Sequence, residues 1–550
     1  MPAHLVPRRP LVVAALALAL LAGCRRQPQA PPSAAPIDAS PRRGGTAVIA
    51  VGSDLQSVNP LLGNTQLIAD VTSRALFLTL LEEQPDFTEH PPTFAPRLAE
   101  RYEWSPDHRT LTFHLRSDVV WSDGVPVDAE DVAWTFAAEK DPDVAWGGSY
   151  TKEQIDRLEV VDPHTVRFHF TQAYLAQLAD ANEGVILPKH VWAALPFKQW
   201  RSGGVWFRDH LVVDGPFEVE SWTPQQELVL RRNPRYFEAG QPRLDRVVVR
   251  VLPDPTTMVT QLLAGTVDYV EQLTPTSAAQ VRAAAQARVL AYPSRQFTAI
   301  AWNTKRPLFA DAAVRRALTL AIDRQELVDT IWRGAATVSS SPLISSVWAH
   351  DRTLAPWPYD PEQAKKILAE RGWSDHDGDG IADRGGRKFS FELTYNAGNR
   401  IRADAAVLIQ NQLRRAGIEA RPRALDHNEM VAENEAHRFD SSIVAWTIDT
   451  SLDMSYAFST EAIAEGTNFG SYSNPELDRL FATARLQTDP ERAKAALVEA
   501  QRILHRDQPY TLLWEPQRLD GVAARLRDVQ PNALSAYFNL RQWWIAEPAR

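Results

Sequence analysis

The 550-residue sequence predicts a mixed α/β protein with several sheets and more than one domain. Two patterns alternate after residue 44. Short runs in which every second residue is hydrophobic are typical of half-buried strands, and longer runs with a period of three to four residues are typical of amphipathic helices. Hydrophobic residues make up 44% and charged residues 23% of the chain, as in ordinary globular domains.

The first 23 residues have the pattern of a bacterial export signal. Arg8 and Arg9 precede an uninterrupted apolar run at 11–22, which is shorter than the roughly 20 residues of a membrane-spanning helix. The following sequence, LAGC, resembles the bacterial lipobox, whose cysteine receives a diacylglycerol. We therefore expect a lipoprotein signal peptide at 1–23, lipidation of Cys24 and a lipid anchor in a bacterial membrane; the alternative is a chance cysteine at a signal cleavage site. Cys24 is the only cysteine, so no disulfides are expected.

Residues 24–43 are rich in proline, alanine and polar residues and show no periodicity, which predicts an extended tether. The folded part is expected to begin near Gly44, with a strand in GGTAVIAV. Further strands are predicted at 110–116, in a hairpin at 158–170, and at 243–252.

Helices are predicted mainly in the second half of the chain. The segment 311–332 has a hydrophobic stripe and Asp311 as its N-cap. A second helix follows Asp360 and ends before Gly372, and the segment 404–423 reads as a helix, a terminal glycine and a strand.

Composition and motifs argue against several functions. The net charge of −9 and the lack of a long basic block argue against a nucleic-acid partner. The sequence has no GxSxG, HExxH, GxxxxGK or GxGxxG pattern, and its 13 histidines are scattered. We therefore expect a protein that is not an enzyme and requires no cofactor, with a secreted hydrolase as the alternative. Seventeen tryptophans serve either the core or a ligand cleft.

One loop has the residues of a cation site. DHDGDGIAD places Gly380 at position 6 of a calcium-loop pattern and aspartates at positions 1, 3, 5 and 9, namely Asp375, Asp377, Asp379 and Asp383. Position 12 is Gly386, so the bidentate glutamate is missing. Two interpretations remain open, a structural calcium ion and a polar turn.

The segment ERYEWSPDHRTLTFHLRSDVVWSDGVPVDAEDVAWTF (100–136) resembles the characteristic region of the family 5 extracellular solute-binding proteins. These are the oligopeptide-, dipeptide- and nickel-type receptors of ABC importers. Further segments match in the expected order: GPFEVESW, RRNPRYF, RRALTLAIDRQELV, YDPEQAKKIL, YSNPELDRL and QRILHRDQPYTLLW. The resemblance covers essentially everything after Gly44.

The resemblance implies a two-lobed fold of the periplasmic-binding-protein type II kind, with an extra inserted domain and a hinge between the lobes. The base domain of lobe one would take 44–85, 212–300 and 512–550, the inserted domain 86–211, and the second lobe 301–511. A solute enclosed between the lobes would favour the closed state, which the importer's permease subunits would recognise. We expect a monomer, exported to the periplasm or the cell surface.

The resemblance also suggests where the solute binds. In the peptide receptors a Trp-x-x-Asp sequence ends a strand, and its aspartate binds the α-ammonium group of the peptide. Trp446 and Asp449 in SSIVAWTIDTSLDM (441–454) match that spacing, but the residues after Asp449 depart from the peptide-receptor pattern. Asp449 is therefore the predicted ligand residue and Trp446 a candidate apolar wall, with loop capping and core packing as their alternatives.

Peptide capture for an importer is the predicted function. A nickel complex, a sugar or an opine is an alternative solute, because fold does not determine the solute. A sensory receptor without a transport role is a further alternative.

Overall fold

The computed structural model describes residues 40–63 and 65–546. The predicted signal peptide, Cys24 and most of the predicted tether lie outside the described residues. Within the described ranges, none of the helices combines the length and apolar character needed to cross a bilayer.

A 12-stranded sheet is the main element of the fold, with the order β18-β17-β19-β13-β20-β11-β1-β10-β9-β8, and with β12 and β14 also paired to β20. Its strands are β1 (Thr46–Val51), β8 (Phe217–Thr223), β9 (Glu227–Arg232), β10 (Arg246–Val251), β11 (Tyr269–Val270), β12 (Ala287–Pro293), β13 (Gln296–Trp302), β14 (Ala336–Thr337), β17 (Ser390–Asn396), β18 (Glu419–Leu425), β19 (Ser441–Thr447) and β20 (Tyr510–Ala523).

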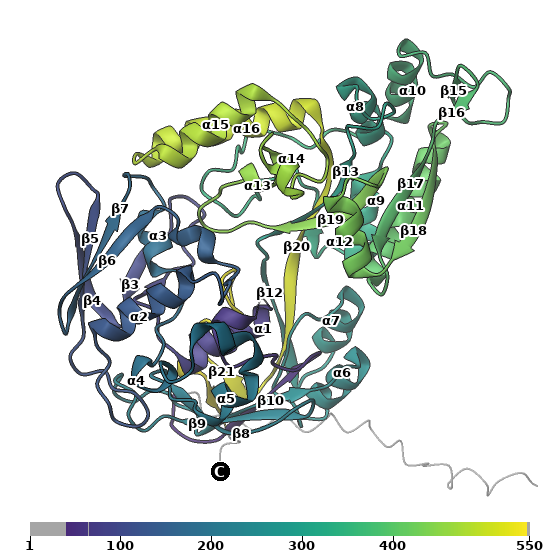
Figure 1. Cartoon of the computed structure of the whole chain (residues 1–550). Coiled ribbons are helices and arrows are strands. Elements are labelled where there is room, and N and C mark those ends of the chain that lie inside the picture. The colour runs from purple at the N-terminus through teal and green to yellow at the C-terminus, as the bar shows by residue number, and fades with distance from the viewer. Residues whose placement is uncertain (1–39, 64, 547–550) are drawn as a thin grey trace, which may run out of the picture. The chain divides into compact units, whose positions relative to one another are not determined.

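Strand β20 connects the two halves of this sheet. Its first residues pair with β13, its middle with β14, and residues 517–523 with β12. Figure 1 shows β20 as one long yellow strand that runs from β13 and β19 toward β12 and β10. Because β12 and β13 are consecutive in sequence and both pair with β20, the connection consists of two adjacent antiparallel segments.

A separate four-stranded antiparallel sheet has the order β4-β5-β7-β6 and packs against helix α2. Its strands are β4 (Ala99–Trp104), β5 (Thr110–Leu115), β6 (Ile155–Asp162) and β7 (Thr165–Phe170). Three two-stranded sheets are small: β2 (Leu81–Glu83) with β3 (Phe94–Pro96), β15 (Asp383–Arg384) with β16 (Arg387–Lys388), and β21 (Leu526–Arg527) with β22 (Trp544–Ile545).

The α-helices are α1 (Gln66–Val71), α2 (Ala129–Lys140), α3 (Gln177–Asn182), α4 (Lys189–Trp192), α5 (Gly204–Asp209), α6 (Pro255–Leu263), α7 (Pro275–Arg282), α8 (Ala312–Leu320), α9 (Arg324–Leu327), α10 (Pro361–Glu370), α11 (Arg400–Arg415), α12 (His427–Glu435), α13 (Ser455–Phe458), α14 (Ala462–Glu465), α15 (Pro475–Leu486) and α16 (Pro490–Asp507). Shorter or irregular turns are η1 (Pro60–Leu62), η2 (Thr72–Leu76), η3 (Ser149–Lys152), η4 (Phe197–Ser202), η5 (Val328–Trp332) and η6 (Leu540–Gln542).

The predicted strands at 110–116 and 243–252 and the hairpin at 158–170 are present as β5, β10 and β6–β7. The prediction of one continuous helix at 311–332 is wrong, because the chain forms three separate helical segments there, α8, α9 and η5. Asp311 caps α8 as expected, but the Asp323 side chain accepts from Glu326 N and so starts a new helix. A local cap thus interrupts a continuous hydrophobic stripe.

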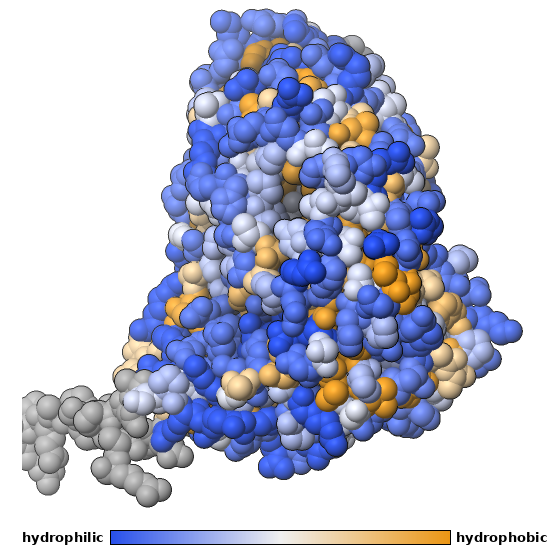
Figure 2. All heavy atoms as spheres, turned by 90° about the vertical axis from the view of Figure 1, so that its left-hand side faces the viewer, coloured by the Kyte–Doolittle hydropathy of each residue, from blue (hydrophilic) through white to orange (hydrophobic). Residues whose placement is uncertain are grey.

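Many of the tryptophans belong to the core. Six are fully buried: Trp121, Trp192, Trp200, Trp302, Trp514 and Trp543. On the face that Figure 2 shows, hydrophobic side chains lie in small groups separated by hydrophilic ones. That distribution is ordinary for a surface in contact with water.

Candidate functional site

The predicted ligand residues lie at and just beyond the carboxyl end of β19, an interior strand of the large sheet between β17 and β13. This strand pairs antiparallel with β13 along its whole length, with Trp446 opposite Phe297. The pairing ends where Ile448 N donates to the carbonyl of Arg295 (2.7 Å). Asp449 is therefore the first residue free of the ladder, and its position is fixed by the strand before it.

Asp449 holds the turn that follows. Its Oδ1 accepts from the Ser451 hydroxyl (2.6 Å) and from Leu452 N (3.1 Å), and Leu452 has a positive φ of 58°. A residue other than glycine rarely adopts this conformation, so side-chain bonds to the turn help to maintain it. Loop capping, the alternative considered for Asp449, is thus present, and it uses one of the two carboxylate oxygens.

The other oxygen faces a different part of the chain. The Tyr150 hydroxyl, in η3, lies 3.5 Å from Asp449 Oδ2, which is long for a bond between two oxygens. Among the described residues it is the only hydrogen-bond donor to Oδ2. Asp449 Oδ2 is therefore available to a stronger donor, such as an ammonium group.

Trp446 lies beside this carboxylate within a group of aromatic rings. Its ring centroid is 5.2 Å from that of Tyr456 and 5.0 Å from that of Phe469, and its indole Nε1 is buried without a hydrogen-bond partner among the described residues. The packing agrees with the core role considered for Trp446.

The electrostatic surroundings of Asp449 are acidic. Burial raises its pKa, while the Ser451 bond and the charge of Arg295 oppose the shift and Asp453 adds to it. The pKa of Glu83 and that of Asp180 are each raised to about 7, mainly by burial and to a smaller extent by the charge of Glu183. These carboxyl groups are close enough to interact, although they come from segments far apart in the sequence.

The aspartate loop keeps three of its four predicted ligands together. One carboxylate oxygen from each of Asp375, Asp377 and Asp379 lies within 4.8 Å of the others. Asp383 instead accepts from His376 N (3.0 Å) and contacts its ring Nδ1 (3.1 Å). The Lys388 ammonium pairs with Asp379 and lies 3.5 Å from Asp377. Both Asp375 oxygens accept backbone N–H bonds, from Gly378 and Gly380.

The loop therefore has oxygen ligands for a hard cation together with an internal cation that neutralises them. Hydrogen bonding to Lys388 holds the pKa of Asp379 below its usual value. A calcium ion would have to displace this ammonium, and the missing glutamate at position 12 gives it no further carboxylate. Calcium binding stays a prediction.

The sequence analysis missed Tyr150, Glu83, Asp180, Glu183 and Arg295. None belongs to a recognisable motif, and they are spread over four parts of the chain, with only Asp180 and Glu183 sharing an element, α3 and its C-cap. A lone tyrosine after Gly147-Gly148 carries no signal of its own. Folding brings the Tyr150 hydroxyl to Asp449 and places the charge of Arg295 close enough to affect its pKa.

Comparisons with known proteins identify the family and the fold. The family model "Bacterial extracellular solute-binding proteins, family 5 Middle" matches residues 93–468. The oligopeptide-binding protein AppA of Bacillus subtilis is 27% identical over 535 residues, which cover 96% of each chain. The AppA structure with a nonapeptide gives a TM-score of 0.77 and covers 92% of this chain and 100% of that one.

Two further proteins show the range of solutes among similar chains. The glutathione-binding protein GsiB of Salmonella paratyphi A is 27% identical over 473 residues, covering 84% of this chain and 87% of that protein. The structure of NikZ from Campylobacter jejuni with Ni(L-His) is 21% identical, has a TM-score of 0.77, and covers 90% of this chain and 99% of that one. This last likeness concerns the fold alone.

Proposed function

The chain belongs to the family 5 bacterial extracellular solute-binding proteins, and from this membership we propose that it captures peptides for an ABC importer. It is a solute receptor of the periplasmic-binding-protein type II fold rather than an enzyme. In this proposal Cys24 carries the lipid that keeps the receptor at the membrane. Closure of the two predicted lobes around the peptide presents the loaded form to the permease.

The observation that supports this proposal is the hydrogen bonding of the two Asp449 carboxylate oxygens. One carboxylate oxygen is fixed in a turn and the other has only a long bond to Tyr150. A carboxylate held rigidly with one oxygen available suits a peptide α-ammonium, which needs a charged partner when it is enclosed. The similarity to a protein named for oligopeptide binding supports the same class of solute.

The sheet supplies the rest of the binding geometry. The backbone of a peptide can bond to exposed strand edges whatever its sequence, which gives affinity without fixing the register. The Asp449 carboxylate would fix the register at the amino terminus. Because β20 joins both halves of the large sheet, a peptide that contacts both halves favours one arrangement of the hinge.

The test is peptide binding by calorimetry to the wild type and to Asp449→Asn. Asparagine keeps an oxygen for Ser451 and Leu452, so the turn is preserved while the charge is lost. Removing one member of a buried charge pair costs about 3–5 kcal/mol, or about a hundred- to several-thousandfold in affinity. Asp489→Asn, which changes the exposed N-cap of α16, is the matched control and should bind normally.

Amino-terminal acetylation tests the same contact from the ligand side. We expect N-acetylated peptides to lose binding to the wild type. Equal binding of free and acetylated peptides would show that Asp449 does not bind the amine. If a broad peptide library gives no binding, a non-peptide solute such as a nickel complex, a sugar or an opine replaces the peptide. A neighbouring gene for a sensor kinase instead of a permease would favour the sensory role.

A further inference from the structure

The hairpin loop between β2 and β3 has one buried side chain. Residues 84–93 form this loop, and Phe87 is 4% exposed, whereas the other residues of the loop are exposed or half-buried. A large apolar ring in an otherwise exposed loop becomes buried only where another part of the chain covers it. Phe87 therefore marks a contact between the hairpin loop and a second segment.

The segments that cover Phe87 lie mostly in the predicted second lobe. Phe87 belongs to a buried hydrophobic cluster whose other buried members all fall between residues 297 and 512. Among them are four consecutive or nearly consecutive residues of one loop: Leu343, Ile344, Val347 and Trp348. The hairpin loop starts in predicted lobe one, so its aromatic side chain connects the two predicted lobes.

A polar contact lies directly beside Phe87. The Arg352 guanidinium donates to Glu89 Oε1 (2.7 Å) and to the Thr88 carbonyl (3.2 Å). The next residue toward the N-terminus, Asp351, is buried and accepts from Arg502 (3.0 Å), which fixes the segment that carries Arg352. The side chains of Arg352 and Glu89 are 56% and 71% exposed, so their ion pair is weak and can break easily.

The hairpin loop is held in shape by bonds across it. Gln84 N donates to the Thr93 carbonyl (2.8 Å). The Asp86 carboxylate accepts from Thr93 N (3.0 Å) and from the Thr93 hydroxyl (2.5 Å). These bonds close the loop just before Phe87, and they present its tip, Phe87 to Glu89, in one fixed conformation.

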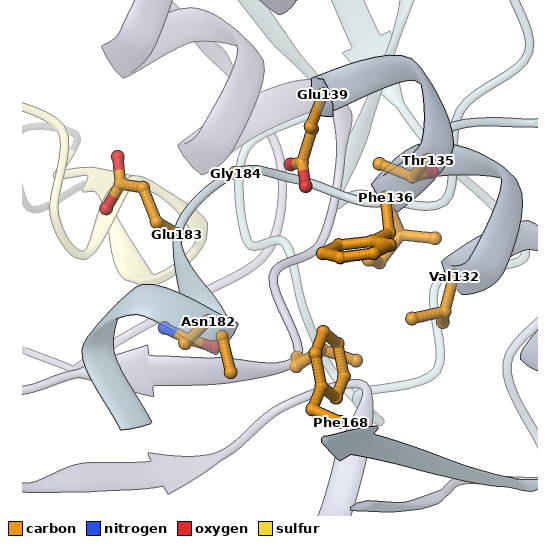
Figure 3. Close-up of a pocket in the computed structure, with 11 residues that line it drawn as sticks. Val132, Thr135, Phe136, Glu139, Phe168, Asn182, Glu183 and Gly184 are labelled. Carbon is orange, nitrogen blue, oxygen red and sulfur yellow. The ribbon is translucent and has the colours of Figure 1, made fainter. Parts of the chain in front are cut away.

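The base of the hairpin is fixed in predicted lobe one. Leu81 N donates to Asn182 Oδ1 (2.7 Å), and the Glu82 carboxylate accepts two bonds from Arg541 (2.8 and 3.0 Å). Figure 3 shows Asn182 at a cavity that Leu80 also lines, with a volume of about 10 Å³. That volume is close to the lower limit for a single water molecule, so the base is closely packed and moves with lobe one.

We propose that the hairpin tip, Phe87 to Glu89, is a latch that favours the closed arrangement of the two predicted lobes, and that opening of the cleft withdraws Phe87 from the second lobe. This inference rests on the proposed function, since it assumes that the hinge closes around a solute. Strands β12, β13 and β20 connect the lobes through the main chain. The hairpin tip adds a noncovalent contact that opening can break.

The burial of Phe87 sets the strength of this latch. Burying one large apolar side chain changes the ratio of closed to open molecules by about ten- to a hundredfold. A solute that binds the closed form has an apparent affinity proportional to the closed fraction of the free protein. The latch therefore strengthens solute binding without contacting the solute, and it shifts the balance between the two forms without preventing opening.

The test measures the radius of gyration of the full-length protein by small-angle scattering, and the affinity for the tripeptide Lys-Ala-Ala by calorimetry. Free Phe87→Ala should have a larger radius than the free wild type, and the two radii should agree at saturating peptide. Its affinity should fall about three- to tenfold. His90→Ala, at an exposed residue of the same loop, is the control and should match the wild type. An unchanged radius of free Phe87→Ala would overturn the inference, whatever its affinity.

A charge reversal tests the latch without changing the core. Glu89→Lys places a second cation beside Arg352 and should increase the radius of the free protein. Glu89→Lys combined with Arg352→Glu restores an ion pair of opposite direction and should return the radius to the wild-type value. If Phe87→Ala fails to fold by circular dichroism, this pair of variants decides: no increase for Glu89→Lys, or an increase that the double variant keeps, would overturn the inference.

The outcomes separate the latch from the proposed function. If Lys-Ala-Ala and other peptides do not bind, the peptide function fails, while the radii of the free proteins still support or overturn the latch. If the wild type binds peptide and Phe87→Ala has an unchanged radius, the latch fails and the peptide function stands.

Discussion

The pH dependence of ligand binding tests the acidic surroundings of Asp449 most directly. Burial, with smaller contributions from neighbouring charges, raises the pKa of Glu83 and of Asp180 to about 7, against ordinary values of 4.5 and 3.8. Around Glu83 the facing groups are Arg295, Glu183 and Arg74. Around Asp180 they are Tyr174, Lys152, Asp449 and Glu183. In the free protein both carboxyl groups therefore keep their protons up to about pH 7.

A bound cation reverses this shift, because it favours the ionised form of each carboxyl group. Binding then releases protons, and affinity increases as pH rises. For a group whose pKa falls from about 7 to its ordinary value, the linkage relation gives an increase of about tenfold between about pH 5.5 and 7. The two carboxyl groups together increase the affinity up to about a hundredfold over the same pH range. This pH range lies below the pKa of the peptide α-amino group, about 7.7–8.0, so the ligand keeps its positive charge throughout.

In the free protein, a rise in pH has the opposite effect and lowers the stability of the fold. A carboxyl group with a raised folded-state pKa destabilises the fold once pH exceeds its unfolded-state value, so Glu83 and Asp180 reduce stability progressively from about pH 4 to 7. A cationic ligand removes this penalty. The increase in melting temperature on binding should therefore be larger at pH 7 than at about pH 5.5.

The assay is calorimetry with Lys-Ala-Ala in buffers of equal ionic strength and different ionisation enthalpy, which reports the protons released. At pH 7 two half-protonated groups predict the release of about one proton. Asp180→Asn keeps an acceptor for the Tyr174 hydroxyl and should remove about half of the pH dependence on a logarithmic scale. Affinity that is constant or decreases between about pH 5.5 and 7, with no proton release, would refute the reasoning.

Three other predictions concern the anchor, the hinge and the aspartate loop. Lipidation predicts that the wild type fractionates with membranes and that Cys24→Ala is released or stays unprocessed; identical fractionation and an unmodified mature N-terminus would contradict it. Hinge closure predicts a smaller radius of gyration by small-angle scattering when a saturating peptide is added, with unchanged circular dichroism. A constant radius at saturation would argue against movement of the lobes. Calcium should bind the chelator-treated protein weakly, and Lys388→Gln should strengthen the binding, because Lys388 pairs with Asp379 and Asp377. If calorimetry detects no heat for either protein, the loop is a polar turn only.

Local patterns predicted much of the fold because they depend on residues close in sequence. The hydrophobic alternation at 110–116 identified β5, and the Asp311 cap marked the start of α8. The break after α8 escaped prediction, since Asp323 is a cap that the continuous hydrophobic stripe conceals. The family resemblance was confirmed, and the predicted domain boundaries stay predictions.

The candidate site, too, was predictable from the sequence only in part. Trp446 and Asp449 were predicted from the resemblance to the peptide receptors, whose Trp-x-x-Asp spacing they match within one segment. The structure adds that Asp449 uses one oxygen in its own turn and offers the other toward Tyr150, a division of roles that the sequence alone leaves open.

The family and the class of fold could be predicted from the sequence, and so could the segment in which the solute is expected, because the motifs that indicate them consist of residues close together in the chain. The charges that act on Asp449 could not all be predicted in this way, because they include Arg295, from a distant part of the chain. Glu83 ends a short strand, Tyr150 lies in a turn fixed by buried Lys152, and Arg295 joins two strands of the large sheet. Electrostatic interaction depends on distance through space and on burial, and chain folding brings these groups together across hundreds of residues.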